Sequence, residues 1–298
     1  MKICPCCESP QVSLYCRVSG GRIEQGRQFD YLQCRICGSV FLSPETLPES
    51  DLYTKEYFST GAGNTFHQWA EGCWCGFLQR LKFRRTPKFP QNAKILDVGF
   101  GDGGWMEFLR ERDFEVHGLD PSKEACAAAR RRGLVNISSG TLENHPFPLA
   151  GFDAITANHC LEHCDSPARF IRHAAILLKP GGWLGIVIPN ISSWEARRAR
   201  GQWYHLDPPY HLCLPMPQIL KEIMETAGLC EIQSRCPVFD CCQSLFYSAL
   251  KKSGSPLFLV PPMLPLLVPI NMVLSCCQRA GVIEFWGRRP PVHEKAIG

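Results

Sequence analysis

The chain has 298 residues, enough for one large domain and a small appendage, and 45% of them are hydrophobic, as in a globular protein with a sizeable core. The formal net charge of +4 is too small to indicate nucleic-acid binding, and no basic run is interleaved with aromatic residues. We therefore expect no nucleic-acid partner.

The chain contains 18 cysteines, and whether they are reduced or form disulfides depends on the cellular compartment. The N-terminal sequence MKICPCCESP lacks the apolar segment of a secretory signal, so we expect a cytoplasmic protein whose thiols stay reduced. Reduced cysteines act as metal ligands or as small buried hydrophobic residues.

Residues 1–42 carry two C-x-x-C pairs, Cys4 with Cys7 and Cys34 with Cys37. Four thiolates suit a closed tetrahedral site, which is structural rather than catalytic, and zinc is the expected metal. Iron and unliganded thiols are the alternatives. The segments VSLYCRV and GRQFDYLQC between the pairs have the composition of strands, and a Gly-Gly turn separates them. So short a segment has little core of its own, so metal ligation would stabilise it. We predict a zinc ribbon over 1–42.

Residues 43–92 contain several prolines and many aromatic side chains. Such side chains need a surface to pack on, so we predict a helical connector that lies on the main domain.

From residue 93 onward, strand-like and helix-like segments alternate. The strand-like segments are AKILDVG, EVHGLD, LVNIS, FDAITA, GGWLGIVIP, LCEIQSRC and GVIEFWGRR. The helix-like segments are GWMEFLRERD, SKEACAAARRRG, about 166–178 and MPQILKEIMETAG. This order predicts an α/β domain over 93–298, built on a doubly wound, seven-stranded, mostly parallel sheet. Ligands of such sheets bind at the carboxyl ends of the strands.

The segment ILDVGFGDGGW ends the first of these strands with Gly99, Gly101 and Gly104 in the G-x-G-x-x-G spacing of dinucleotide sites. Asp97 argues against a dinucleotide, because its charge would repel a pyrophosphate by on the order of several kcal/mol at a partly buried site. S-adenosylmethionine carries an ammonium and a sulfonium and no phosphate, so a carboxylate beside the loop favours it. Asp120, which ends the second strand, could accept the ribose hydroxyls of either cofactor.

These residues resemble motifs of the class I SAM-dependent methyltransferases. Asp97-x-Gly99-x-Gly101 resembles the first motif, VHGLDPS the second, and FDAITANHCLEHCDSPARFIRHAAILLKPGGWLGIVIPN the fourth and fifth strand regions. The segment WYHLDPPYHL, followed by MPQILKEIMETAGL, is similar to one found in a subgroup that often carries an N-terminal zinc ribbon. The resemblance implies a Rossmann-like methyltransferase fold and S-adenosylmethionine as cofactor.

The resemblance also implies a set of cofactor-binding residues. They are Gly99 and Gly101 at the methionine portion with Asp97 beside them, Asp120 at the ribose, Thr141 and Leu142 at the adenine, and Asn158 with His159 at the sulfonium end.

Methyl transfer to a hydroxyl requires a base, and histidine is a common one. The resemblance favours His211, in the proline-stiffened loop QWYHLDPPYHL; the alternative is that His211 packs this loop. His159 is the second candidate, because it follows the fourth strand directly. His163 is either a further candidate or a structural hydrogen-bonding group. Trp203, Tyr204 and His205 either shape the acceptor pocket or pack the loop.

Residues 256–277 carry no charge and approach the length of a membrane span. Five prolines would break a lipid-exposed helix, and a strand-like segment follows, so a span is the least favoured interpretation. We expect an apolar insertion over 255–278 that forms a substrate lid, a dimer patch or a peripheral membrane contact.

The sequence therefore predicts a SAM-dependent methyltransferase that methylates a small-molecule acceptor, with a sugar or natural-product hydroxyl as the first choice. Two alternatives stay open: an inactive methyltransferase-like scaffold that binds a partner through its ribbon, and an NAD-dependent oxidoreductase. The oligomeric state does not follow from the sequence.

Overall fold

The computed structural model describes residues 2–20, 27–43, 76–250 and 260–291. The strands of the larger sheet are β4 (Lys94–Val98), β5 (Glu115–Asp120), β6 (Ile137–Ser139), β7 (Phe152–Asn158), β8 (Leu178–Pro189), β10 (Cys230–Arg235) and β11 (Val282–Arg288). Their order is β10-β11-β8-β7-β4-β5-β6. The five strands from β8 to β6 are parallel, whereas β11 is antiparallel to both of its neighbours, β8 and β10. The predicted seven-stranded, mostly parallel sheet is confirmed.

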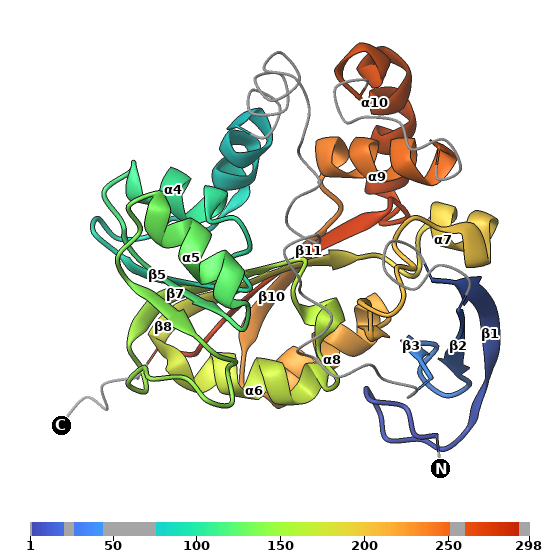
Figure 1. Ribbon diagram of the computed structural model, residues 1–298, viewed down its shortest axis with the longest axis horizontal. Coiled ribbons are helices and arrows are strands. Elements are labelled where there is room, and N and C mark those ends of the chain that lie inside the picture. The colour runs from blue at the N-terminus through green and yellow to red at the C-terminus, as the bar shows by residue number, and fades with distance from the viewer. Residues whose placement is uncertain (1, 21–26, 44–75, 251–259, 292–298) are drawn as a thin grey trace, which may run out of the picture.

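Helices cover both faces of this sheet (Figure 1). On one face lie α4 (Gly104–Arg110), α5 (Lys123–Arg131) and the helical residues 76–85, and on the other lie α6 (Pro167–Leu177) and α8 (Pro217–Thr226). Successive residues of a strand point to opposite faces. Accordingly, Ile95 packs in the core cluster of α4 and α5, and its neighbour Leu96 packs in that of α6 and α8. This alternation is what makes buried strands of such a sheet apolar throughout.

The predicted ends of α5 agree with the structure. The hydroxyl of Ser122 accepts a hydrogen bond from the backbone N–H of Ala125 at 3.1 Å, and Gly133 follows the helix with φ +76°. A serine cap and a left-handed glycine are the usual signals for the start and end of a helix.

The cysteine-rich N-terminus forms a second, smaller sheet from β1 (Val12–Ser19), β2 (Gln28–Cys34) and β3 (Val40–Leu42). A fourth strand, β9 (Cys213–Leu214), comes from the loop before α8 and pairs with β3. The aromatic side chains of Phe29 and Tyr31 pack in one cluster with Trp203. The N-terminal segment is thus joined to the larger part of the chain by strand pairing and by a shared core.

Three helices had not been predicted: α7 (Trp194–Ala199), α9 (Val238–Leu250) and α10 (Val260–Cys276). Figure 1 shows α7, the α9–α10 pair and the small sheet beyond the same end of the large sheet, on the right of the view. Residues 76–85 of the predicted connector are helical, whereas 44–75 lie outside the described residues, as do 255–259 of the apolar insertion.

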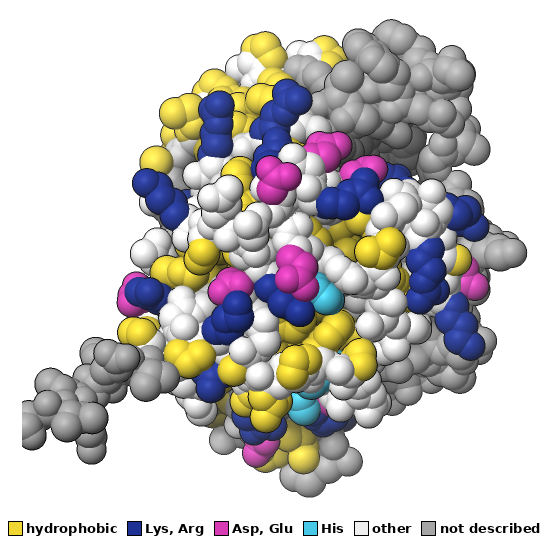
Figure 2. Space-filling model, turned by 90° about the vertical axis from the view of Figure 1, so that its left-hand side faces the viewer, with side chains coloured by type: hydrophobic (Ala, Val, Ile, Leu, Met, Phe, Trp, Pro, Cys, Tyr) yellow, Lys and Arg dark blue, Asp and Glu magenta, His cyan; other side chains and the backbone are white. Residues whose placement is uncertain are grey.

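The sequence predicts that the prolines of α10 would break a helix exposed to lipid. Outside a bilayer, α10 continues through Pro265 and Pro269. Pro265 and Pro269 lie four residues apart and both are exposed, so the backbone bonds they remove fall on one outward side of the helix, where water can bind the freed carbonyl groups. Within the described ranges, no helix combines the length and apolarity needed to cross a bilayer. On the face drawn in Figure 2, basic and acidic side chains are interspersed.

Candidate active site

The glycine-rich loop lies between β4 and α4, at the carboxyl end of the sheet. Gly99 and Gly101 have φ values of +68° and +57°, which side chains other than glycine rarely adopt. A Cβ atom at Gly99 would lie 2.5 Å from the sulfur of Cys160, so there is no room for a side chain. At Gly101 a Cβ would meet nothing within 4 Å, so this part of the loop faces open space. A ligand can therefore approach the backbone at Gly101.

Asp120 ends the neighbouring strand β5 and holds this loop. One carboxylate oxygen accepts a hydrogen bond from the N–H of Gly101 at 3.0 Å, and the other accepts from the N–H of Ser122 at 2.9 Å. Burial raises the pKa of Asp120, and these two bonds oppose that effect. Each oxygen keeps a lone pair, which a ribose hydroxyl could use.

Asp97 is buried at the end of β4. Its carboxylate accepts a hydrogen bond from the Thr156 hydroxyl at 2.6 Å. Burial raises the pKa of Asp97 to about 6, although Thr156 and the positive charge of Lys82 both lower it. Burial also lowers the pKa of Lys82 to about 8. The sequence had not indicated Lys82, which comes from the helical residues 76–85, as a partner of this carboxylate.

The remaining residues assigned to the cofactor lie at the same edge of the sheet. Asn158 is the last residue of β7, and Thr141 and Leu142 follow β6, with the Leu142 side chain buried in the core of α6 and α8. The role of Asp102, which the sequence did not indicate, is local: it accepts from the N–H of Gly104 at 3.0 Å and pairs with Arg132 at 3.4 Å. Asp102 thus shapes the start of α4.

A cavity of about 380 Å³ lies next to His159, immediately beyond the end of β7. Its lining includes four histidines, His159, His163, His205 and His211, which come from two separate segments. The fold therefore places both candidate bases, His159 and His211, around one space. Tyr204 also lines it, whereas the Trp203 side chain is fully buried and packs the loop. We call this space the histidine cavity.

Glu162 is the fully buried carboxylate of this cavity. The ring Nδ1 of His159 donates to its Oε1 at 3.2 Å, and its Oε2 has no hydrogen-bond partner among the described residues. Burial raises the pKa of Glu162, but the hydrogen bond from His159 and the nearby imidazoles outweigh it, and the pKa falls to about 2. Glu162 is therefore an anion across the physiological pH range.

Backbone carbonyl groups orient two of the imidazole rings. Nδ1 of His163 faces the carbonyl of Tyr210 at 3.0 Å, and Nδ1 of His211 faces the carbonyl of His205 at 2.7 Å. A carbonyl only accepts, so Nδ1 carries the proton in each neutral ring and the lone pair is on Nε2. Burial lowers the pKa of His163 to about 4, with a smaller effect from the charge of His211.

Several residues of the histidine cavity had not been indicated by the sequence. Asp207 lies in the same loop as His211, and Asp240 and Ser244 come from α9. The Ser244 hydroxyl donates to buried Glu195 at 2.9 Å and faces Nε2 of His205 at 2.9 Å. Only the tertiary structure brings α9 to this loop, so no local pattern could have identified these residues.

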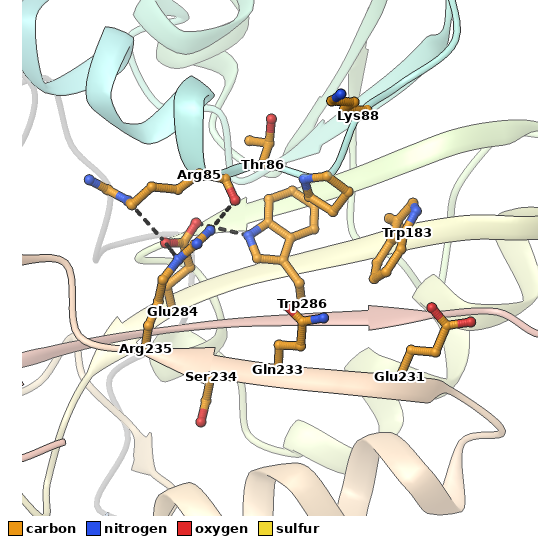
Figure 3. Close-up of a pocket in the computed structure, with 11 residues that line it drawn as sticks. Arg85, Thr86, Lys88, Trp183, Glu231, Gln233, Ser234, Arg235, Glu284 and Trp286 are labelled. Atoms are coloured by element: carbon orange, nitrogen blue, oxygen red, sulfur yellow. Dashed lines mark hydrogen bonds and ion pairs between the residues drawn. The ribbon is translucent and has the colours of Figure 1, made fainter. Parts of the chain in front are cut away.

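A second cavity, of about 430 Å³, lies on the antiparallel strands at the edge of the sheet. Figure 3 shows the buried carboxylate of Glu284 between Arg85 and Arg235, with the indole N–H of Trp286 donating to it at 2.9 Å. Arg85 also pairs with Asp240 at 2.8 Å. Arg85, Arg235 and Glu284 pair with one another, so this network fixes the helical residues 76–85 to β10 and β11 and links them to α9.

The four cysteines of the two C-x-x-C pairs are brought together, with their sulfur atoms all within 4.8 Å of one another. The sulfurs are 3.6 Å apart for Cys4 and Cys37 and 3.5 Å apart for Cys7 and Cys34. A tetrahedral zinc site with Zn–S bonds of about 2.3 Å requires sulfurs about 3.8 Å apart, so the four thiols fit such an ion.

Curated relatives match parts of this chain. It is 38% identical over 95 residues to the ubiquinone biosynthesis O-methyltransferase of Vibrio parahaemolyticus. The aligned residues cover 30% of this chain and 40% of that protein. It is 29% identical over 135 residues to the malonyl acyl-carrier-protein O-methyltransferase of Enterobacter lignolyticus, which is 45% of this chain and 51% of that protein. The chain thus spans about half the length of the curated relatives it matches.

Solved structures share the fold. A SAM-dependent methyltransferase from Thermotoga maritima, described as a possible histamine N-methyltransferase, superposes with a TM-score of 0.51 at 18% identity, over 75% of this chain and 98% of that one. A SAM-dependent methyltransferase from Archaeoglobus fulgidus gives a TM-score of 0.50 at 18% identity, over 72% of this chain and 93% of that one.

A family model described as a methyltransferase domain matches residues 66–233. This match covers more than half of the 298 residues and includes the glycine loop, Asp120 and the loop of His211. Together with the seven-stranded sheet, it shows that the chain belongs to the methyltransferase-domain family.

Proposed function

We propose that this protein transfers the methyl group of S-adenosylmethionine to a hydroxyl of a small molecule held in the histidine cavity. The observation that carries the proposal is the position of this cavity, next to His159 and directly beyond the end of β7, the strand that adjoins β4 and its glycine loop. Both curated relatives described above are named O-methyltransferases, which supports an oxygen acceptor.

The cofactor would supply a methyl group on a sulfonium. Asp120 would accept ribose hydroxyls, and Gly101 would let the methionine portion pass close to the backbone. Asp97 is a buried carboxylate near the end of β4, just before the loop. Its charge would favour the ammonium and sulfonium groups of the cofactor. Thr141, Leu142 and Asn158 are proposed to contact the rest of the cofactor from the ends of β6 and β7.

The histidines would remove the proton of the acceptor hydroxyl. The Nδ1 of His211 donates to a carbonyl group, so the lone pair of this ring is on Nε2. The Nδ1 of His159 donates to the carboxylate of Glu162, so the lone pair of neutral His159 is also on Nε2. A base held within reach of the acceptor contributes about 10²–10⁴-fold to the rate. Alignment of the nucleophile with the methyl group supplies the rest.

We also propose that the four clustered cysteines bind one structural zinc ion. Burial raises the pKa of Cys34, but hydrogen bonds from the backbone at Cys37 and Ile36 outweigh it and lower the pKa to about 7. Burial raises the pKa of Cys7 to about 12 and also raises that of Cys37, so the distances between the four sulfur atoms, rather than the thiol pKa values, support the zinc site.

Calorimetric titration with S-adenosylhomocysteine tests the cofactor site. We expect one-site binding that weakens about 10–100-fold in Asp120→Ala, since each lost hydrogen bond to a carboxylate is worth about 1.5–3 kcal/mol. The matched control is Glu115→Gln, at the opposite end of β5. A folded protein that binds no S-adenosylhomocysteine would refute the proposal and support the scaffold hypothesis. If binding is found, incubation with labelled S-adenosylmethionine and a panel of hydroxylated acceptors tests the reaction.

A further inference from the structure

We propose that Glu162, His163 and His211 bind a divalent transition-metal ion in the histidine cavity. One carboxylate oxygen of Glu162 and one ring nitrogen of each histidine lie within 4.8 Å of one another. The histidine rings are 4.8 Å apart between centroids and meet edge to face at 83°. All three residues line the cavity, so an ion could enter from the space where the acceptor is proposed to bind.

The buried carboxylate is the first argument for a cation. Glu162 is fully buried, and its Oε2 has no hydrogen-bond partner among the described residues. Leaving a buried charged group incompletely satisfied is costly, and native proteins rarely do so without a reason such as an ion. His159 compensates only Oε1. A metal ion next to Oε2 would satisfy the second oxygen.

The orientation of the two rings is the second argument. Metal-binding histidines usually donate their other ring N–H to a backbone carbonyl or a carboxylate, which fixes the tautomer and raises the basicity of the ligand nitrogen. His163 and His211 both have this arrangement, through the carbonyl groups of Tyr210 and His205. Both carbonyls belong to the 205–211 loop, so one loop orients both rings.

The donor set indicates the class of metal. Two imidazole nitrogens and one carboxylate oxygen suit Zn²⁺, Mn²⁺, Fe²⁺ or Co²⁺, and three protein ligands leave positions open for a substrate. Bonds of about 2.0–2.2 Å would place the donor atoms about 3.0–3.5 Å apart, so the side chains would close around the ion by small rotations. Asp207 and Asp240 line the same cavity and add negative charge, although Arg85 already pairs with Asp240.

The consequence for catalysis rests on the proposed function. An acceptor oxygen bound at an open position would be polarised by the ion, and the pKa of its hydroxyl would fall. The hydroxyl proton would pass to Nε2 of His159, the C–O bond to the methyl group would form, the C–S bond would break, and S-adenosylhomocysteine would leave. In this arrangement His211 holds the ion, and His159 is the base.

Manganese binding tests the site independently of methyl transfer. The full-length protein, with the metal in its cysteine cluster retained, is titrated with Mn²⁺ and free Mn²⁺ is followed by electron paramagnetic resonance. Mn²⁺ prefers oxygen and nitrogen donors, so it should not displace zinc from four thiolates. We expect one bound Mn²⁺ per chain, and an affinity at least about tenfold lower in both Glu162→Gln and His211→Gln. The matched control is His117→Gln, which removes a histidine paired with Glu115 at 2.8 Å outside the cavity and should leave binding unchanged.

Three outcomes would overturn the metal site: no Mn²⁺ or Co²⁺ binding by the wild type, wild-type affinity in both folded cavity variants, or an equal loss in His117→Gln. Thermal unfolding identifies a variant that is not folded, and the second cavity variant then decides. Titration of the same samples with S-adenosylhomocysteine separates the two proposals. A wild-type protein that binds S-adenosylhomocysteine but not Mn²⁺ would refute the metal site alone. A wild-type protein that binds Mn²⁺ but not S-adenosylhomocysteine would refute the methyl transfer alone.

Discussion

At the scale of single residues, Gly99 and Gly101 share a left-handed backbone but differ in their surroundings. Gly99 touches Cys160, whereas Gly101 faces open space. The same motif therefore serves two purposes: the first glycine allows close packing of the loop on the segment after β7, and the second leaves room for a ligand.

Alanine at these two positions should have different effects. Gly99→Ala combines about 1–2 kcal/mol of backbone strain with a Cβ 2.5 Å from the Cys160 sulfur, so we expect a large loss in the free energy of unfolding. Gly101→Ala should cost only the backbone strain but weaken binding of S-adenosylhomocysteine, because its Cβ enters the open space. Urea unfolding and calorimetry measure the two effects. Equal stability losses in both variants would contradict the contact with Cys160.

The raised pKa of Asp97 predicts how cofactor binding depends on pH. Above a pH of about 6 the carboxyl is ionised in the ligand-free protein, and its charge favours the ammonium group of S-adenosylhomocysteine. Below that pH, binding must first release a proton, which costs about 1.4 kcal/mol per pH unit. We expect the affinity for S-adenosylhomocysteine to fall by up to about tenfold per unit below a pH of about 6.

The matched variant for this prediction is Asp97→Asn, which keeps the size of the side chain and removes its titration. Its affinity should be lower than that of the wild type at pH 8 and nearly constant between pH 5 and 8. If the wild type shows the same flat profile, Asp97 does not act on the ligand through its charge.

The sequence indicates more of the proposed cofactor side of the site than of the proposed acceptor side. Asp97, Gly99, Gly101 and Asp120 belong to two short strand-loop units, so their positions follow from local patterns. The acceptor side depends on α9, whose Asp240 and Ser244 are brought to the cavity only by packing against the 203–211 loop. The partnership of Lys82 with Asp97 is likewise tertiary.

At the scale of elements, we expect the proposed zinc ion to stabilise the small sheet, because two of its four strands, β3 and β9, have only three and two residues. We expect Cys34→Ser to reduce the zinc content from one ion per chain and to lower the unfolding free energy by on the order of several kcal/mol. Metal analysis and thermal unfolding measure both. Cys230→Ser, on β10 and outside the cysteine cluster, is the control. A wild type without zinc would contradict the proposed metal.

The peripheral membrane contact through 256–277 stays a prediction, and variants of α10 can test it. Several of its apolar side chains are exposed, including Leu266 at 59% and Val273 at 67%. Burying an aliphatic side chain is worth about 1.5–3 kcal/mol, so we expect sedimentation with phosphatidylglycerol-containing vesicles to be lost in Leu266→Asp and Val273→Asp. Val135→Asp, at an apolar residue elsewhere that is even more exposed, at 85%, should bind as the wild type does. Wild-type protein that stays in the supernatant would remove this prediction.

The elements that the sequence missed have physical reasons in common. β3 and β9 are too short to show a pattern of their own; β3 forms by pairing with β2 and β9, and β9 forms by pairing with β3. The prolines of α10 argued against a helix, and the outward placement of Pro265 and Pro269 removes that objection. Most of the seven predicted strands are long, and the central ones, such as β7 and β8, are also apolar, so their periodic signal is strong.

At the scale of the whole molecule, the small sheet, the 205–211 loop and the histidine cavity form one connected structure. The backbone N–H of Leu212 donates to the carbonyl of Glu162 at 2.7 Å, and β9 begins at the next residue, Cys213. From the other side, the hydroxyl of the fully buried Tyr31 donates to the carbonyl of His211 at 2.9 Å. The peptide group that follows His211 is therefore held at both ends, by Tyr31 of the N-terminal sheet at its carbonyl and by Glu162 at its N–H.

Tyr31→Phe removes this support without touching the cavity or the cysteine cluster. A buried carbonyl that loses its donor costs about 1–3 kcal/mol, and part of that cost should appear as movement of the loop that carries His211. We expect unchanged binding of S-adenosylhomocysteine, because Asp97, Gly101 and Asp120 lie on other elements, together with a loss of up to about tenfold in kcat/KM for the acceptor. The control is Tyr15→Phe, whose hydroxyl donates to the carbonyl of Ala196 at 3.3 Å, away from the cavity. If both variants lose acceptor activity equally, the effect is one of general stability. If Tyr31→Phe alone does so, the N-terminal sheet positions the acceptor side of the active site, which gives a mechanical role to a segment that would otherwise only bind metal.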